Sequence, residues 1–323
     1  MKRRALGFLI SLWAVLTLNF LLPRLLPGDP LAALLDPSSS AYVFNSATRA
    51  SLAEYYGLDR PLTQQYADYL AGTLRGDLGQ SIRLNRPVGE LLRAHLPWTL
   101  LLTLTALSAA SLLGVLGGAE AAWRRGSATD KALVASSVIA SNAPVFFTGM
   151  ILLIVFGARL DWLPLAGGRT AFARYGTPWE AARDYAAHLA LPAVTLTLAL
   201  VGSKFLLVRN SMIGVLGEDY MLVARAKGLS TGRLKRHHAL RNALIPFVHH
   251  LAAHAGFALT GALFIETLFN YPGMGRLVFE SVVARDYPVI QGVFVVVSAL
   301  VLGANLLADW LSYRLDPRRR EAL

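Results

Sequence analysis

Long apolar stretches alternate with short polar ones along the chain, and this pattern predicts a membrane protein. One apolar run follows the basic start Lys2-Arg3-Arg4 and extends from Ala5 to Leu22. At about 18 residues it is long enough to span a bilayer and longer than the apolar core of a cleaved signal peptide. We therefore interpret it as a retained first helix. Five later segments are also long enough to span a membrane: Pro97–Ala119, Ala132–Phe156, Leu189–Val208, Leu244–Phe269 and Val289–Trp310.

Six such spans predict an all-α polytopic fold with both termini on one side of the membrane. The positive-inside rule places the termini and the loops 120–131 and 209–243 in the cytoplasm. In this topology the net charge of +11 falls entirely on the cytoplasmic side. That distribution favours a membrane surface over a nucleic-acid partner. Composition agrees, because 54% of the residues are hydrophobic and only 16% are charged, against about 25% charged in soluble domains.

The same pattern divides the chain into four parts: an N-terminal helix (1–26), an outer region (27–96), a membrane core (97–310) and a cytoplasmic tail (311–323). The outer region has an amphipathic helical pattern formed by Tyr66, Tyr69, Leu70, Thr73 and Leu74. About 70 residues suffice for a lid or a docking platform but not for an independent binding domain.

The loop between the fourth and fifth spans predicts two short helices around a glycine corner. Glu218 and Asp219 suit the positive end of a helix dipole. A helix-forming stretch runs from Tyr220 to Lys227, and Gly228 is a typical residue after a helix end. Ser230 or Thr231 can cap a second helix that passes through 234–240. A rigid element attached to two membrane helices can transmit a push; the alternative is an ordinary basic loop.

Few residues offer chemistry of their own. No phosphate-binding loop is present in the sequence, so ATP would have to be handled by another subunit. The span serines have no histidine close in sequence, and we read them as helix-packing residues. His250 and His254 share a helix face, but without a suitably spaced carboxylate they are weak metal candidates. Glu266 and Asp309, as ionisable residues near membrane depth, are candidates for a transport pathway.

The order of several motifs gives the chain a family resemblance. Asp219-Tyr220, then Ala224-Arg225-Ala226-Lys227-Gly228-Leu229 and Arg236-His237-His238-Ala239-Leu240-Arg241-Asn242-Ala243-Leu244-Ile245-Pro246, resemble the cytoplasmic coupling loop of ABC-importer permeases of the dipeptide, oligopeptide and nickel branch. Further motifs of that branch follow in order along nearly the whole chain: Pro27-Gly28-Asp29-Pro30, Gly57-Leu58-Asp59-Arg60-Pro61-Leu62, Gly76-Asp77-Leu78-Gly79-Gln80-Ser81, Asp161-Trp162-Leu163-Pro164, Glu266-Thr267-Leu268-Phe269, Tyr271-Pro272-Gly273-Met274-Gly275, Arg285-Asp286-Tyr287-Pro288-Val289-Ile290-Gln291-Gly292 and Leu315-Asp316-Pro317-Arg318.

The resemblance implies a type I importer permease in a bacterial inner membrane. Its partners would be a second permease, two ATPase domains that bind ATP and Mg²⁺, and an extracytoplasmic solute-binding protein; this chain itself would bind no cofactor. The ATPase contact would consist of Glu218, Asp219, Tyr220, Leu222, Val223, Ala224, Arg225, Lys227 and Gly228.

Within this picture Asn142 joins Glu266 and Asp309 as a candidate for the pathway lining. One departure concerns the start of the loop, where Leu222-Val223-Ala224 replaces the Glu-Ala-Ala of the wider superfamily. Leu222 would then be an apolar docking anchor, or Glu218 or Asp219 would substitute for the missing acid. The implied cargo is a peptide, with a nickel chelate as the alternative; a secondary carrier and a membrane hydrolase are more distant alternatives.

Overall fold

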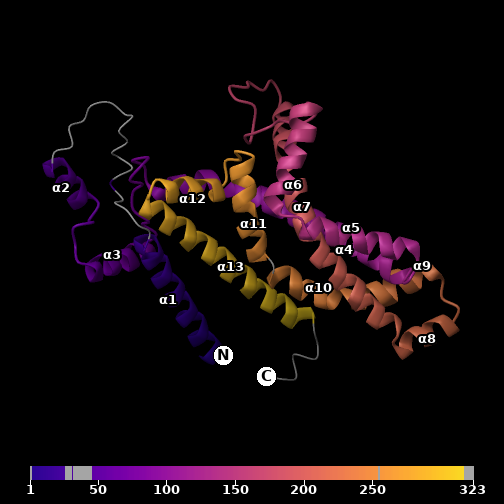
Figure 1. Cartoon of the computed structure of the whole chain (residues 1–323). Helices are drawn as coiled ribbons and strands as arrows, with labels where there is room; N and C mark the ends of the chain where they lie inside the picture. The colour runs from indigo at the N-terminus through magenta and orange to yellow at the C-terminus, as the bar shows by residue number, and fades with distance from the viewer. Residues whose placement is uncertain (1, 26–30, 32–45, 254, 316–323) are drawn as a thin grey trace. The chain divides into compact units, whose positions relative to one another are not determined.

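The computed structural model describes residues 2–25, 31, 46–253 and 255–315, and these form a helical protein (Figure 1). An isolated antiparallel bridge joins Gln80 and Pro87. Because this bridge is isolated and every regular element is a helix, the all-α prediction is confirmed for the described residues. The expected turn Pro27-Gly28-Asp29-Pro30 and the end of the tail motif, after Leu315, lie outside them. The chain divides into two compact units, 1–97 with 272–300 and 98–271 with 301–323. We describe each unit separately.

The helices follow one another in the order α1 (Lys2–Leu25), α2 (Ser46–Tyr55), α3 (Leu62–Arg75), α4 (Val88–Trp123), α5 (Ala128–Asn142), α6 (Val145–Leu152), the π-helix η2 (Leu153–Arg159), α7 (Pro178–Leu216), α8 (Asp219–Ala226), α9 (Thr231–Arg233), the π-helix η3 (Leu234–Leu240), α10 (Arg241–Ala253), α11 (Ala255–Leu268), α12 (Met274–Val283) and α13 (Tyr287–Leu315).

Three helices among the described residues are long and apolar enough to cross a membrane: α4, α7 and the 287–306 part of α13. The bent pair formed by α5 and the segment Val145–Arg159 adds a fourth candidate. The expected first span coincides with α1, whose described apolar part, Ile10–Leu25, is shorter. The expected fifth span corresponds to α10 and α11, on either side of residue 254, which lies outside the description. The count of six spans stays a prediction.

The expected span Ala132–Phe156 is not one straight helix, because the chain bends by 100° between Asn142 and Val145. Ala143 has an extended backbone, with φ −66° and ψ 134°, and Pro144 begins the next helix. A proline clashes with a helical conformation of the preceding residue. Pro144 therefore ends α5, and α6 and η2 continue in a different direction.

The core of the second unit joins α4, α7 and α11. Small residues allow α4 to approach α7 closely: a Cβ atom added to Gly118 would lie 2.7 Å from the main-chain oxygen of Phe205, and one added to Gly114 would lie 2.8 Å from the Lys204 Cβ atom. Such glycine contacts are typical of helix pairs in membranes. The buried apolar cluster of these helices consists of Leu102, Ala106, Leu191, Ala193, Leu196, Ala262, Ile265, Phe269 and Tyr271.

In the first unit, α3 packs on α1 through the face that the sequence predicts. The rings of Tyr66 and Tyr69 lie 5.1 and 5.7 Å from the Phe20 ring, and the Tyr66 hydroxyl forms a 2.7 Å hydrogen bond with Thr17. The helix ends before Gly76, whose φ of +79° is left-handed. Glycine adopts this conformation without steric cost.

A buried aspartate joins the segment after α3 to the corner between α12 and α13. The Asp286 carboxylate accepts hydrogen bonds from the Ser81 hydroxyl at 2.5 Å and from the main-chain nitrogens of Ile82 and Arg83 at 3.1 Å. On α12, the Glu280 carboxylate pairs with Arg83 at 2.7 Å and with Arg276 at 2.8 Å. The 81–83 turn is thereby held to the start of α13 within this unit.

Candidate functional site

The loop that follows α7 contains the predicted helix and glycine corner. Glu218 stands at the N-cap position with an extended backbone, although its side chain makes no capping hydrogen bond. The helix α8 ends at Ala226, and Gly228 has a φ of +72°. This left-handed conformation reverses the chain direction at the position predicted from the sequence. Figure 1 shows α8 and α9 together at the end of the unit where α7 finishes.

Two details of the loop differ from the prediction. Ser230 stands at the N-cap position of α9, but its side chain makes no capping hydrogen bond. The second helix is also not a separate short element, since α9 passes through η3 into α10 without a break. Similarly, α7 continues to Leu216, so the non-helical part of the expected loop 209–243 is confined to residues near its glycines. The element is consequently more rigid than an extended loop.

The short helix α8 has one buried face and one exposed face. Met221 is fully buried and Ala224 is 6% exposed. They stand three positions apart and therefore share one side of the helix. They pack in a cluster with Ala119 and Ala122 of α4, Met212 of α7, Leu234 and Ala239 of η3, and Ala243 of α10.

The opposite face carries apolar side chains that none of the described residues covers. Leu222 is 69% exposed and Val223 is 53% exposed. Among the other predicted contact residues, Glu218, Asp219, Tyr220, Arg225, Lys227 and Gly228 are also exposed. A pair of exposed apolar residues among polar neighbours is a feature of protein interaction sites. Of the nine predicted contact residues, Ala224 is the one that faces inward.

Polar contacts attach this loop to the membrane helices on either side. The Tyr220 hydroxyl accepts a hydrogen bond from the Asn242 amide at 2.7 Å and donates to the main-chain oxygen of His238 at 3.4 Å. Lys235 of η3 forms an ion pair with Glu120 of α4. The loop thus contacts α4 as well as the helix that follows it.

A second ion pair joins the start of α5 to the C-terminal part of α7. Arg209 of α7 donates two hydrogen bonds to the Asp130 carboxylate, at 2.7 and 2.9 Å. The main-chain nitrogen of Gly126 donates to the same carboxylate at 2.9 Å, and the Ser127 side chain caps α5. Bidentate pairing fixes the orientation of both side chains.

The pathway and metal candidates are found in separate places. Glu266 is fully buried in α11, whereas Asn142 is exposed at the end of α5, where its amide donates to the main-chain oxygen of Val138. Asp309 lies in α13, but its side chain is outside the description, as is His254. His250 is partly buried in α10. In the part of the chain that the structure describes, no group of three or more His, Cys, Asp or Glu residues could hold a metal ion.

The contacts that attach the loop include residues that sequence reasoning did not single out. Asn242, Glu120, Asp130 and Arg209 are 22 to 115 positions distant from their partners. No local periodicity or motif relates such positions. Only complementary charge on one predicted side of the membrane could have suggested the two ion pairs.

Comparison with known proteins places these features in a family. The family model described as "Binding-protein-dependent transport system inner membrane component" matches residues 110–321. The chain belongs to this family. The family resemblance predicted from the coupling-loop motifs is confirmed, and so is the role of an ABC-transporter permease, a membrane subunit that is not itself an enzyme. Membership favours neither the secondary carrier nor the hydrolase alternative.

Full-length relatives agree with this assignment. The chain is 38% identical to a probable peptide ABC transporter permease protein of Sinorhizobium fredii, with 93% of this chain and 92% of the relative aligned. It is 36% identical to the di/tripeptide transport system permease protein DppB of Pseudomonas aeruginosa and to the glutathione transport system permease protein GsiC of Escherichia coli, each over 98% of this chain and 97% of the relative. A crystal structure of an amino acid ABC transporter with histidines has 16% identity and a TM-score of 0.49, and the match covers 70% of this chain and 94% of that one.

Proposed function

We propose that this family member is a permease subunit of an ATP-driven importer for short peptides and that α8 is its contact with an ATPase subunit. Peptide cargo is supported by the relatives, whose names refer to peptides, di- and tripeptides and glutathione. The observation that carries the ATPase contact is the two-faced helix α8, anchored through Met221 and exposed through Leu222.

The attachment of α8 suits it to transmit motion. Its buried face packs against α4, α7, η3 and α10, and hydrogen bonds from Tyr220 join it to the start of α10. A displacement of α8 would therefore move these helices with it, because close-packed interiors transmit strain. ATP and Mg²⁺ would be bound by the partner ATPases, and this chain would bind no cofactor.

The replacement of the superfamily acid by Leu222 predicts a mainly apolar contact. Covering a leucine side chain contributes about 1.5–3 kcal/mol to association, and Val223 would add to it. The exposed charges of Asp219, Arg225 and Lys227 surround these two residues and would orient the partner.

The remaining partners and the orientation complete the proposal. A second permease would form the other half of the pathway, and an extracytoplasmic solute-binding protein would deliver the peptide. The termini and the α8 loop would face the cytoplasm of a bacterial inner membrane, as the distribution of basic residues predicts. Asn142, Glu266 and Asp309 stay candidates for the pathway.

A cysteine cross-linking experiment tests the ATPase contact. The sequence contains no cysteine, so a single Leu222→Cys substitution gives one reactive thiol. The variant would be assembled with its ATPase and permease partners and treated with a short thiol-to-amine cross-linker. We expect a cross-linked product with the ATPase that changes in yield when ATP is added.

The matched control is Phe172→Cys, because Phe172 is also exposed but lies before α7. The 39 residues of α7, about 58 Å of helix, separate it from α8. Equal cross-linking of both variants to the ATPase, or none at Leu222, would contradict the contact. ATP-dependent uptake of a dipeptide into proteoliposomes tests the transport function; uptake driven by a proton gradient without ATPase subunits would overturn it.

A further inference from the structure

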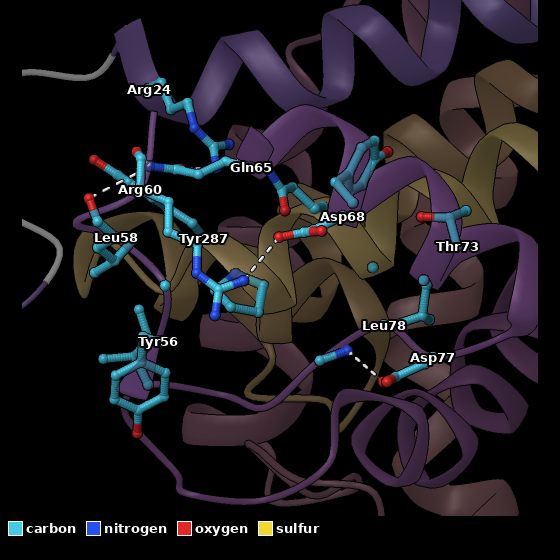
Figure 2. A pocket seen from close by; sticks show the side chains of 18 of the residues that line it. Arg24, Tyr56, Leu58, Arg60, Gln65, Asp68, Thr73, Asp77, Leu78 and Tyr287 are labelled. Atoms are coloured by element: carbon cyan, nitrogen blue, oxygen red, sulfur yellow. Dashed lines mark hydrogen bonds and ion pairs between the residues drawn. The ribbon is translucent and has the colours of Figure 1, made fainter. Parts of the chain in front are cut away.

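The first unit contains a cavity of about 320 Å³ (Figure 2). Its wall combines the end of α1, the 55–60 turn, α3, the 77–82 segment and the start of α13. The volume is at the lower end of the range of about 300–1,000 Å³ for small-molecule pockets. The proposed orientation places the outer region 27–96, which supplies most of this wall, outside the cytoplasm, where cargo arrives before it enters the pathway.

An arginine that has no carboxylate partner among the described residues lines this cavity. The Arg24 guanidinium lies 3.6 Å from the centre of the Phe20 ring and donates to the Phe20 main-chain oxygen at 2.9 Å and to the Gln65 side-chain oxygen at 2.8 Å. Figure 2 shows it reaching toward Gln65. Among the described residues no Asp or Glu pairs with it, whereas Arg60 on the same wall is paired with Asp68 at 2.9 Å. Arg24 therefore keeps its charge and further N–H groups available for an anion.

Two more donors on the cavity wall lack acceptors within the described structure. The Gln291 side-chain nitrogen is buried and makes no hydrogen bond. The Tyr69 hydroxyl is also buried, and although Thr73 is its neighbour, it makes no hydrogen bond of ordinary geometry. Buried polar groups are nearly always hydrogen-bonded. Donors from α1, α3 and α13 on one cavity wall point to a ligand that supplies acceptor oxygens.

We propose that this cavity is an accessory binding site for the terminal carboxylate of a short peptide. The inference rests on the proposed peptide transport. A carboxylate is an acceptor-only group that matches the arginine fork, and the rings of Tyr56 and Tyr287 supply aromatic surface for the rest of the ligand. A phospholipid phosphate brings similar oxygens, and Arg24 lies at the end of an apolar helix. The experiment must therefore separate these two sources.

The test measures binding to the full-length chain in nanodiscs of phosphatidylcholine, without ATPase subunits. The probes are the dipeptide alanyl-phenylalanine, the tripeptide trialanine, and alanyl-phenylalanine with an amidated C-terminus. Isothermal titration calorimetry measures the binding of each. We expect saturable binding of at least one free-acid peptide. Amidation and Arg24→Gln should each raise Kd by about tenfold or more, as expected when a charge-assisted hydrogen bond is lost.

Arg86→Gln is the matched control, because Arg86 pairs with Glu90 at 3.3 Å and is not on the cavity wall. Its Kd should stay within about twofold of the parent. Gln291→Glu replaces a donor by an acceptor of similar shape and should weaken binding as well. This second variant keeps the test decisive if Arg24→Gln does not fold, which thermal unfolding would reveal.

Three outcomes would overturn the site: no saturable binding of either free-acid peptide, equal binding of acid and amide, or equal effects of Arg24→Gln and Arg86→Gln. Binding of short-chain phosphatidylglycerol that depends on Arg24, without peptide binding, would assign the site to a lipid and also reject the proposal. ATP-dependent uptake by the assembled transporter distinguishes the two proposals. Binding without uptake would contradict the transport function, whereas uptake without binding would contradict the accessory site.

Discussion

The glycine corner after α8 gives a prediction in which the backbone alone decides the outcome. Gly228 has a φ of +72°, and a Cβ atom added there would meet no atom within 4 Å. Gly228→Ala therefore creates no clash and changes only the preference of the backbone. An L-residue in the left-handed region costs about 1–2 kcal/mol. The reduced entropy of the unfolded chain offsets about 0.4–1 kcal/mol of this, leaving a net loss of about 1 kcal/mol.

Gly232 supplies a matched control in the same loop. It lies in α9, and an added Cβ atom there would also meet nothing within 4 Å, but its φ is not left-handed. Gly232→Ala should therefore stabilise the helix, by about 0.5–1 kcal/mol. Gly228→Asn should cost less than Gly228→Ala, because asparagine tolerates the left-handed conformation better than other side chains.

Hydrogen exchange of the α8 amides in nanodiscs measures this difference locally. A loss of about 1 kcal/mol corresponds to roughly fivefold faster opening. Gly228→Ala should accelerate α8 exchange by about that factor, Gly228→Asn by less, and Gly232→Ala should slow exchange or leave it unchanged. If both alanine variants shift exchange in the same direction, the left-handed corner does not determine the stability of α8.

Three further predictions follow from burial and charge. Met221→Ala should lower the free energy of unfolding in SDS titration by about 2–5 kcal/mol, whereas Leu222→Ala, on the exposed face, should change it by less than about 0.5 kcal/mol; equal losses would contradict the two-faced helix. Gly118→Ala should lower the thermal unfolding temperature, since its Cβ would lie 2.7 Å from the Phe205 main-chain oxygen, and an unchanged temperature would show that α4 and α7 can separate freely. Burial acts to raise the pKa of Glu280, but hydrogen bonds from its two arginine neighbours outweigh it and the pKa is lowered. The stability that this carboxylate supplies should therefore be present above its usual pKa of 4.5 and be lost as pH falls below that value, and Glu280→Gln should weaken this acid dependence of thermal unfolding.

Sequence reasoning succeeded where a local property decides the structure. The apolar segments predicted the long helices α4, α7 and α13, because the length of an apolar run determines whether it can span a bilayer. The position of Gly228 predicted the corner after α8, because the left-handed conformation strongly favours glycine. The order of the family motifs predicted a permease of binding-protein-dependent transport, which the family match confirmed.

Sequence reasoning was less successful where several elements meet. The 100° bend at Pro144 could not be predicted, since an apolar segment does not reveal whether its two halves stay in line. The partners Lys235 and Glu120 lie 115 positions apart, and Asp130 and Arg209 lie 79 apart, so no local pattern joins them. The cavity at Arg24 likewise depends on segments that are distant in the sequence.

The amino-acid sequence by itself determined that this protein is a helical membrane permease with a basic, glycine-cornered loop. These properties depend on hydrophobic run length, charge distribution and the conformational range of single residues. Only the tertiary structure decided which face of α8 is buried, because Met221 and Leu222 are adjacent apolar residues and packing against α4 and α7 distinguishes them. It also decided that Arg24 lines a cavity and donates to Gln65, since a side chain's partners are set by the elements packed around it.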